Sequence, residues 1–278
     1  LLIIREMFDR DNAVRIMGYY GMAIGITPAI GPIIGGYIHV LAGWRMNFVL
    51  LALLAAGAFL LVCRFLPETG TRDHSAVHPR QVVRSYLALL RRRTYLRYLL
   101  PLAVMFGTLF AFVTAGPFLL IDRFGIATQD YGLYYGVLVL AFMMGGLTVS
   151  RMVGRVGADR LVQMALFFAF LGSVGLVGPL VANIDSVAAI ISAMTLLCFG
   201  IGVILASGPT CLFDGAGNGP IGPASALVGA LQMAAASLAG LLVGSFHDGS
   251  AWPMALTIAS FTSIGILGYF GFRDSRPI

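Results

Sequence analysis

The residues best suited to chemistry in this sequence are few and scattered. The chain has 12 Asp and Glu, 4 His and 3 Cys, and none of the acids or histidines lies deep inside a long apolar run. His74 and His78 have a helical metal-ligand spacing, but they lie in a polar segment with no further ligand nearby, and the cysteines form no CxxC pair. We therefore predict no metal, no cofactor and no catalytic cluster, which makes a membrane-embedded enzyme the weaker alternative.

One amide stands out inside the apolar part of the sequence. Gln232 is the only strongly hydrogen-bonding amide near the middle of an apolar run. Because an unpaired amide in hydrocarbon is costly, it should face other helices or a cavity. Two interpretations stay open: a contact to substrate, or an interhelical hydrogen bond that only holds the helices together. Further candidates for binding a hydrophobic ligand are Ser225, Met233, Met22, Phe106, Phe110 and Tyr135.

Apolar runs cover most of the 278 residues and predict an all-α integral membrane protein. Hydrophobic residues make up 59% of the chain and charged residues 11%, with a mean hydropathy of +0.91. About 20 apolar residues in a helix cross roughly 30 Å of hydrocarbon. Residues 1–4 resemble the tail of a further span, and eight complete spans are predicted at 16–41, 46–66, 98–121, 131–153, 160–182, 185–207, 221–244 and 251–272.

The arginines predict an orientation for these spans. The chain has 18 basic residues, all of them arginine. If the segment after residue 4 is cytoplasmic, alternating loops leave only Arg45 and Arg123 outside, as the positive-inside rule expects. The net charge of +6 is thus a consequence of topology, and no nucleic-acid partner is predicted.

The longest polar segment, residues 67–97, separates two groups of spans. Arg84 and Arg91 share one helical face with Arg80, while Leu87 and Leu90 share another with Val83. This pattern is typical of an amphipathic helix on an anionic membrane surface. A solvated linker helix without lipid contact is the equal alternative.

A stripe of glycines and prolines runs along the first complete span. Small residues at four- and three-residue steps let a second helix approach backbone to backbone, and paired prolines bend a helix. We predict that the stripe packs against the run 131–153, which has small residues at Gly132, Gly136, Gly145 and Gly146. The stripe and its neighbours are Gly21, Gly25, Pro28, Gly31, Pro32, Gly35 and Gly36.

The stripe resembles the antiporter motif in the fifth helix of drug:proton antiporters of the major facilitator superfamily (MFS). Segments 43–48, 65–69 and 222–233 resemble its bicyclomycin and chloramphenicol resistance (Bcr/CflA) branch. The resemblance implies an MFS-type bundle, with this chain matching helices 4–12 of a twelve-helix fold. Residues 1–66 are then the remainder of the first six-helix bundle, 67–97 the cytoplasmic linker and 98–278 the second bundle. It also implies that the proton-carrying acid precedes this chain, which we expect to be inactive alone.

Residues 150–160 resemble the second copy of the superfamily's gating motif. There, glycines allow a tight cytoplasmic turn, and pairs of Arg and Asp stabilise a closed state. Arginines are also expected at this helix end from topology alone, so both interpretations stay open. The candidate gate residues are Arg151, Gly154, Arg155, Asp159 and Arg160.

The pattern as a whole favours a secondary active transporter that exports small hydrophobic drugs by alternating access, with the proton as coupling ion. A facilitator or importer of a small metabolite with the same fold is the main alternative. We expect a multi-pass protein of the bacterial inner membrane, with the lipid bilayer and a drug as its partners, that is a monomer when full length.

Overall fold

The computed structural model describes residues 30–31, 33–65, 79–217 and 221–272. Seven helices in these ranges are long and apolar enough to cross a membrane. They are α3 (Trp44–Phe65), α5 (Arg93–Pro117) with its π-helical continuation η1 (Phe118–Arg123), α6 (Thr128–Val156), α7 (Ala158–Val181), α8 (Val187–Ala216), α9 (Ile221–Ser245) and α10 (Trp252–Gly271). The all-helical membrane fold predicted from hydropathy is therefore confirmed, and residues 1–4 lie outside the described ranges.

Contacts divide the chain into two compact units. The first contains residues 1–76 and 127–136, and the second contains residues 77–126 and 137–278. In the first unit, the described part of the span predicted at 16–41 is the helix Ile33–Ala42, which ends at Gly43 with a positive φ of 81°. The Asn47 amide donates to the Gly35 carbonyl at 3.3 Å and thereby links this helix to α3.

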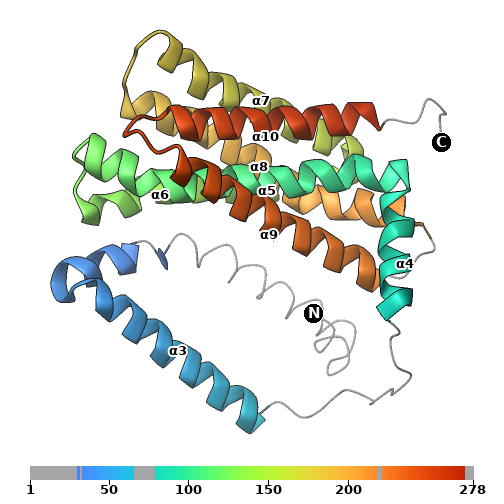
Figure 1. Ribbon diagram of the computed structural model, residues 1–278, viewed down its shortest axis with the longest axis horizontal. Helices are drawn as coiled ribbons and strands as arrows, with labels where there is room; N and C mark the ends of the chain where they lie inside the picture. Colours follow the sequence, from blue (N-terminus) through green and yellow to red (C-terminus); the bar gives the residue numbers. More distant parts are fainter. Residues whose placement is uncertain (1–29, 32, 66–78, 218–220, 273–278) are drawn as a thin grey trace. The chain divides into compact units, whose positions relative to one another are not determined.

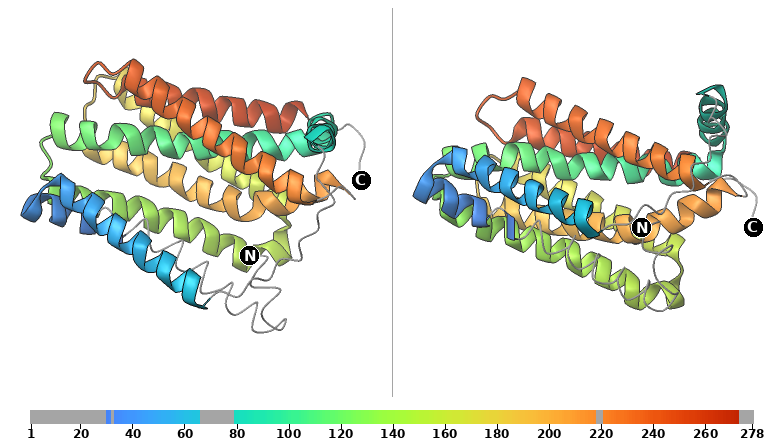
Figure 2. Two further views of the ribbon diagram at one scale, coloured as in Figure 1. Left: turned by 60° about the horizontal axis from the view of Figure 1, so that its bottom comes forward. Right: turned by 90° about the horizontal axis from the view of Figure 1, so that it is seen from below.

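The helices of the second unit pack around α5. Contacts join α5 to α8, α9 and α10, and α7 packs along α8 and α10, as Figures 1 and 2 show. The α7–α8 pair meets through small residues: a Cβ on Gly172 would lie 2.7 Å from the Ala193 carbonyl oxygen, and one on Gly200 would lie 2.6 Å from that of Ala165. Backbones this close maximise van der Waals contact, which is how helices associate in lipid.

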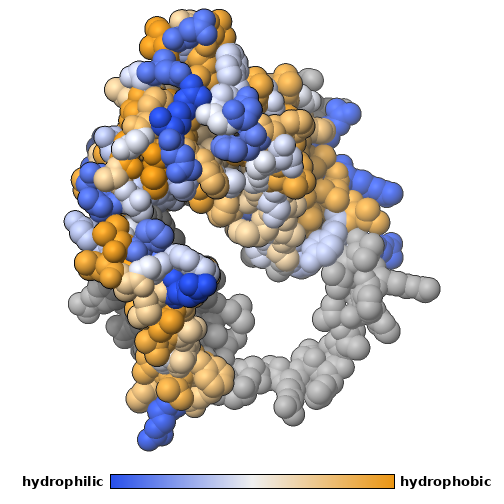
Figure 3. Space-filling view, turned by 60° about the vertical axis from the view of Figure 1, so that its left-hand side comes forward, coloured by the Kyte–Doolittle hydropathy of each residue, from blue (hydrophilic) through white to orange (hydrophobic). Residues whose placement is uncertain are grey.

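The outward surfaces of the helices are apolar. No described residue of α3 is buried, and Leu53 and Phe59 expose about two thirds of their surface (66% and 67%). Figure 3 looks toward the end at which α5, α7 and α9 finish, where hydrophilic residues gather while hydrophobic ones lie along the helices. This distribution suits helices whose sides face lipid and whose ends reach water.

Two helix boundaries differ from the sequence prediction. The run predicted at 185–207 continues as α8 through Pro209 to Ala216, and the run predicted from residue 98 starts at Arg93. In both cases the added residues are partly polar, so hydropathy excluded them. Their helical structure depends on contacts between the two helix ends, described below.

The amphipathic helix predicted in the linker is present as α4 (Pro79–Leu90). It packs on α5 and α9 with Leu89 buried, while Leu87 and Leu90 of the predicted apolar face remain exposed. Arg84 is exposed as well. The side chains of Arg80 and Val83 are outside the described part.

Candidate functional site

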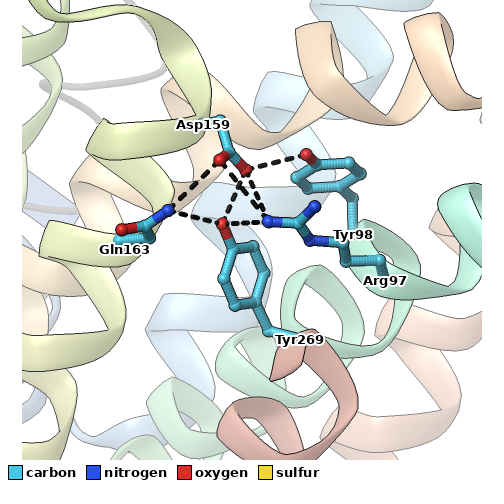
Figure 4. Close-up of polar contacts among 5 residues, drawn as sticks. All are labelled: Arg97, Tyr98, Asp159, Gln163 and Tyr269. Atoms are coloured by element: carbon cyan, nitrogen blue, oxygen red, sulfur yellow. Dashed lines mark hydrogen bonds and ion pairs between the residues drawn. The ribbon is translucent and has the colours of Figure 1, made fainter. Parts of the chain in front are cut away.

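A cluster of five polar side chains joins three helices at one end of the second unit. This arginine-rich end is the one at which α5, α7 and α9 begin. Arg97 and Tyr98 come from the first turns of α5, Asp159 and Gln163 from the start of α7, and Tyr269 from the end of α10 (Figure 4). We call these five residues the Asp159 cluster.

The carboxylate of Asp159 is the acceptor at the centre of the cluster. The hydroxyl groups of Tyr98 and Tyr269 donate to its Oδ1 at 2.8 and 2.6 Å. Arg97 Nη2 lies 3.2 Å from Oδ1 and 3.4 Å from Oδ2, and Gln163 Nε2 donates to Oδ2 at 3.2 Å. Four donors from three helices thus stabilise one negative charge.

The arginine of this cluster is held by aromatic rings as well as by the carboxylate. Its Nη2 donates to the Tyr269 hydroxyl at 2.6 Å. Its guanidinium carbon lies 4.4 Å from the centre of the Tyr269 ring and 5.3 Å from that of Tyr98. The exposed fraction of the side chain is only 16% for Arg97, against 44% for Asp159. Removal of the carboxylate would leave this enclosed positive charge unpaired, which costs more free energy than breaking an ion pair at a free surface.

Local sequence explains how the carboxylate reaches this position. Gly157 precedes α7 with φ of 84°, a conformation that favours glycine and lets α6 end and α7 begin within a few residues. Asp159 then lies in the first turn of α7, where the helix dipole favours negative charge. Gln163 is one turn further on the same face.

A second set of polar contacts at the same end starts from the residues just before the cluster. Arg92 donates to the carbonyl of Ala216, and Thr94 donates to that of Gly215 at 3.3 Å, so the start of α5 caps the last turn of α8. The buried Tyr95 hydroxyl donates to the Ala224 carbonyl of α9 at 2.8 Å. The first turns of α5 are therefore hydrogen-bonded to α8 and α9, in addition to the bonds to α7 and α10 in the Asp159 cluster.

The structure separates the candidate gate residues. Only Asp159 belongs to the cluster, and its cationic partner comes from α5 rather than from the arginines of residues 150–160. The side chains of Arg151, Arg155 and Arg160 are exposed, and a Cβ on Gly154 would have no neighbour within 4 Å.

Three of the candidate substrate residues, Gln232, Phe106 and Phe110, lie on or against one face of α5. Gln232 donates to the Leu102 carbonyl at 3.4 Å. The face of α5 that includes Leu102 also includes Phe106 and Phe110, because these residues follow at four-residue steps. The Gln232 amide therefore contacts α5 on the face that has both rings, whose centres are 5.0 Å apart. Met233 is 55% exposed.

Three substrate candidates remain, which are Ser225, Tyr135 and Met22. The side chain of Ser225 is exposed. Tyr135 belongs to the first unit, where its ring centre lies 6.2 Å from that of Tyr131. Met22 lies outside the described residues.

The glycine stripe can be followed only at its end, because Gly21, Gly25, Pro28 and Pro32 lie outside the described residues. Within the first unit, a Cβ on Gly36 would lie 3.2 Å from the Thr128 carbonyl oxygen, and one on Gly132 would lie 2.8 Å from Ile33 Cγ1. The helix Ile33–Ala42 therefore meets the first turns of α6, at Thr128 just before the run 131–153 and at Gly132 within it. Gly31 and Gly136 have no such neighbour.

Sequence reasoning missed four of the five residues of the Asp159 cluster. Arg97 counted only toward orientation, and Tyr98, Gln163 and Tyr269 drew no attention. The one usable signal was position, because Arg97 and Asp159 precede their predicted spans and Tyr269 lies near the end of its span, which places all three near the predicted cytoplasmic side.

Comparisons with known proteins agree with this architecture. A family model described as Major Facilitator Superfamily matches residues 1–241. The chain is 27% identical to the bicyclomycin resistance protein homolog of Haemophilus influenzae, over 99% of this chain and 69% of that protein. It is 23% identical to the chloramphenicol resistance protein of Pseudomonas aeruginosa, over 95% of this chain and 62% of that protein.

Further similarities extend the comparison. The multidrug transporter MdfA of Escherichia coli O157:H7 is 28% identical over 83% of this chain and 56% of its own length. A solved bacterial homologue of the iron transporter ferroportin, in an inward-facing state, matches with a TM-score of 0.66 at 12% identity, over 98% of this chain and 66% of that chain. At that identity the match shows the fold alone.

Proposed function

Because the chain belongs to the major facilitator superfamily, we propose that it serves the proton-coupled export of small hydrophobic drugs across the bacterial inner membrane. A multi-pass transporter, and not an enzyme, is what the family and the helical architecture show. The observation that carries the proposal is the match of nearly the whole chain to antibiotic resistance proteins. We further propose that the full-length transporter is a monomer.

The Asp159 cluster supports a mechanism of alternating access, in which helix bundles rock as bodies around a substrate site. Such motion requires each bundle to stay intact while it moves. The cluster ties α5, α7 and α10 together at the arginine-rich end through Asp159, and Arg92 and Tyr95 add α8 and α9. We propose that this end of the second unit moves as one piece.

The test is drug efflux from energised vesicles that contain the gene product carrying this chain. Chloramphenicol or ethidium should be moved against its gradient, and a protonophore should abolish the movement. The opposite result is movement only down the drug gradient, insensitive to protonophore, which would show a facilitator.

A variant of Gln232 tests where the substrate binds. A 3.4 Å bond to a carbonyl is at the weak limit, so Gln232→Ala should cost about 0.6 kcal/mol of stability and leave the protein level nearly unchanged. If the amide contacts substrate, relative resistance to different drugs changes. Uniform loss of resistance that follows a fall in protein level would assign the amide to packing alone.

A further inference from the structure

A groove opens between α9 and α10 beside the turn that connects them. α9 packs mainly on α5, and α10 packs on α5 and α7, while the two touch each other only sparsely. The helices diverge from their connecting turn, as Figure 1 shows. The groove has a volume of about 490 Å³, within the range of small-molecule sites, and its lining includes Leu242, Phe246, Asp248, Trp252, Leu256 and Ser260.

Most of the lining is apolar and accessible. Phe246 is 68% exposed and Leu256 is 52% exposed. The hydroxyl of Thr257, which also lines the groove, is already bonded to the Pro253 carbonyl at 2.8 Å. For a ligand dissolved in the bilayer such a surface offers van der Waals contact, because lipid tails are as apolar as these side chains and leave no hydrophobic driving force. A polar contact must therefore supply the preference for the groove.

Asp248 is the only charged residue of the lining. The backbone N–H and the hydroxyl of Ser250 donate to its Oδ1 at 2.8 and 2.6 Å. These hydrogen bonds lower the pKa of the Asp248 carboxyl, so it stays ionised at neutral pH. Both of these bonds end on Oδ1.

The basic side chains that reach this turn do not line the groove. Arg123 is bonded to the carboxylate of Asp185 at 2.5 Å and to the Gly249 carbonyl at 2.8 Å. His247 lies against Phe118, with ring centres 5.3 Å apart. An anionic phospholipid headgroup would therefore bring its phosphate beside the Asp248 carboxylate, and like charges repel.

We propose that this groove binds amphipathic organic cations from the bilayer. The apolar body of the ligand lies against Phe246 and Leu256. Its cationic head lies between the Asp248 carboxylate and the indole ring of Trp252, which attracts cations through its π face. None of the lining residues is among the substrate candidates, so the site is additional to the proposed export function and does not depend on it.

The two tryptophans of the chain make this binding measurable. In a Trp44→Phe background, Trp252 is the only tryptophan, and bromine quenches its fluorescence at contact range. The protein in nanodiscs of an uncharged glycolipid is titrated with a bromoalkyl trimethylammonium salt, and with the bromoalkyl alcohol and carboxylate of equal chain length. The cation should quench saturably and bind about five-fold more tightly than the alcohol, the factor expected for one exposed charge pair.

Three variants isolate the groove from simple partition into lipid. Asp248→Asn should reduce the affinity for the cation to that for the alcohol, whereas Asp122→Asn, an exposed acid at the same end, should leave it unchanged. Ser260→Phe should weaken quenching by the cation and the alcohol alike, because it fills the groove. Thermal unfolding of each variant verifies that it is folded.

The outcomes that would overturn the proposal are equally defined. Equal affinity for cation and alcohol, or an unchanged affinity in Asp248→Asn, would show that no cation site exists. Competition by added phosphatidylethanolamine would show that a lipid occupies the groove instead. None of these results bears on drug export.

Discussion

At the scale of single residues, Asp159 joins three helices through the hydrogen bonds of its side chain. Its carboxylate collects two tyrosine hydroxyls, one guanidinium and one amide from three helices. A charge with this many donors is stable in a membrane protein only while every donor stays in place. Rearrangement of any one of α5, α7 or α10 therefore has a free-energy cost at this end.

Replacing the central carboxylate should loosen this end of the bundle. Asp159→Asn keeps the shape but removes the charge that pairs with Arg97, so we expect the free energy of unfolding to fall by about 1–3 kcal/mol. Unfolding can be followed by a thiol-reactive dye in a Cys63→Ser background, because Cys198 and Cys211 are buried whereas Cys63 is exposed. Asp214→Asn, at an exposed acid outside the cluster, is the control. Equal unfolding temperatures for both variants would contradict the role of the cluster.

At the scale of elements, helix pairs in this protein depend on single glycines at their crossing points. A Cβ on Gly145 of α6 would lie 2.3 Å from the Phe199 carbonyl oxygen of α8, and one on Gly202 would lie 2.0 Å from that of Phe142. The neighbouring Gly146 has no atom within 4 Å of its Cβ position. Of these two adjacent glycines, only Gly145 is required for packing.

Adjacent substitutions in α6 test this difference. Gly145→Ala should separate α6 from α8 and destabilise the protein by about 1–3 kcal/mol, the usual cost of overpacking. Gly146→Ala should have little effect, because its added methyl group meets no neighbour. Thermal unfolding in detergent compares the two. The packing argument is wrong if both variants unfold at the temperature of the parent chain.

At the scale of the whole molecule, coupling to protons needs an ionisable group at membrane depth. The six acids of the described ranges, Asp122, Asp130, Asp159, Asp185, Asp214 and Asp248, lie at helix ends or in turns. The other acids lie outside the apolar runs of the sequence. No carboxylate of the described residues is therefore buried within a span, and the sequence places none of the others inside an apolar run.

Expressed by itself, the chain of 278 residues should insert into membranes but should not drive uphill export. Apolar spans and the arginine bias suffice for insertion. Coupling to protons, in contrast, requires an ionisable group at membrane depth. Proteolysis of exposed loops measures insertion, and efflux of ethidium from energised vesicles measures transport. Efflux that a protonophore abolishes would show that a group at a helix end, such as Asp159, carries the proton.

The sequence by itself determined the membrane class, the positions of seven spans and the family. These depend on average properties of runs of about 20 residues, which a hydropathy pattern reports without any knowledge of contacts. The ends of α5 and α8 were misplaced, because Arg92 and Thr94 extend them through bonds to Ala216 and Gly215 that no local pattern contains.

Only the tertiary structure decided which polar residues act together. Arg97, Asp159 and Tyr269 are separated by 62 and 110 residues along the chain, and their contact depends on the packing of three helices. The same holds for the groove beside Asp248, which exists because α9 and α10 each pack on α5 rather than on each other. Spans follow from local composition, but sites follow from the way the spans pack, and that information is distributed over the whole chain.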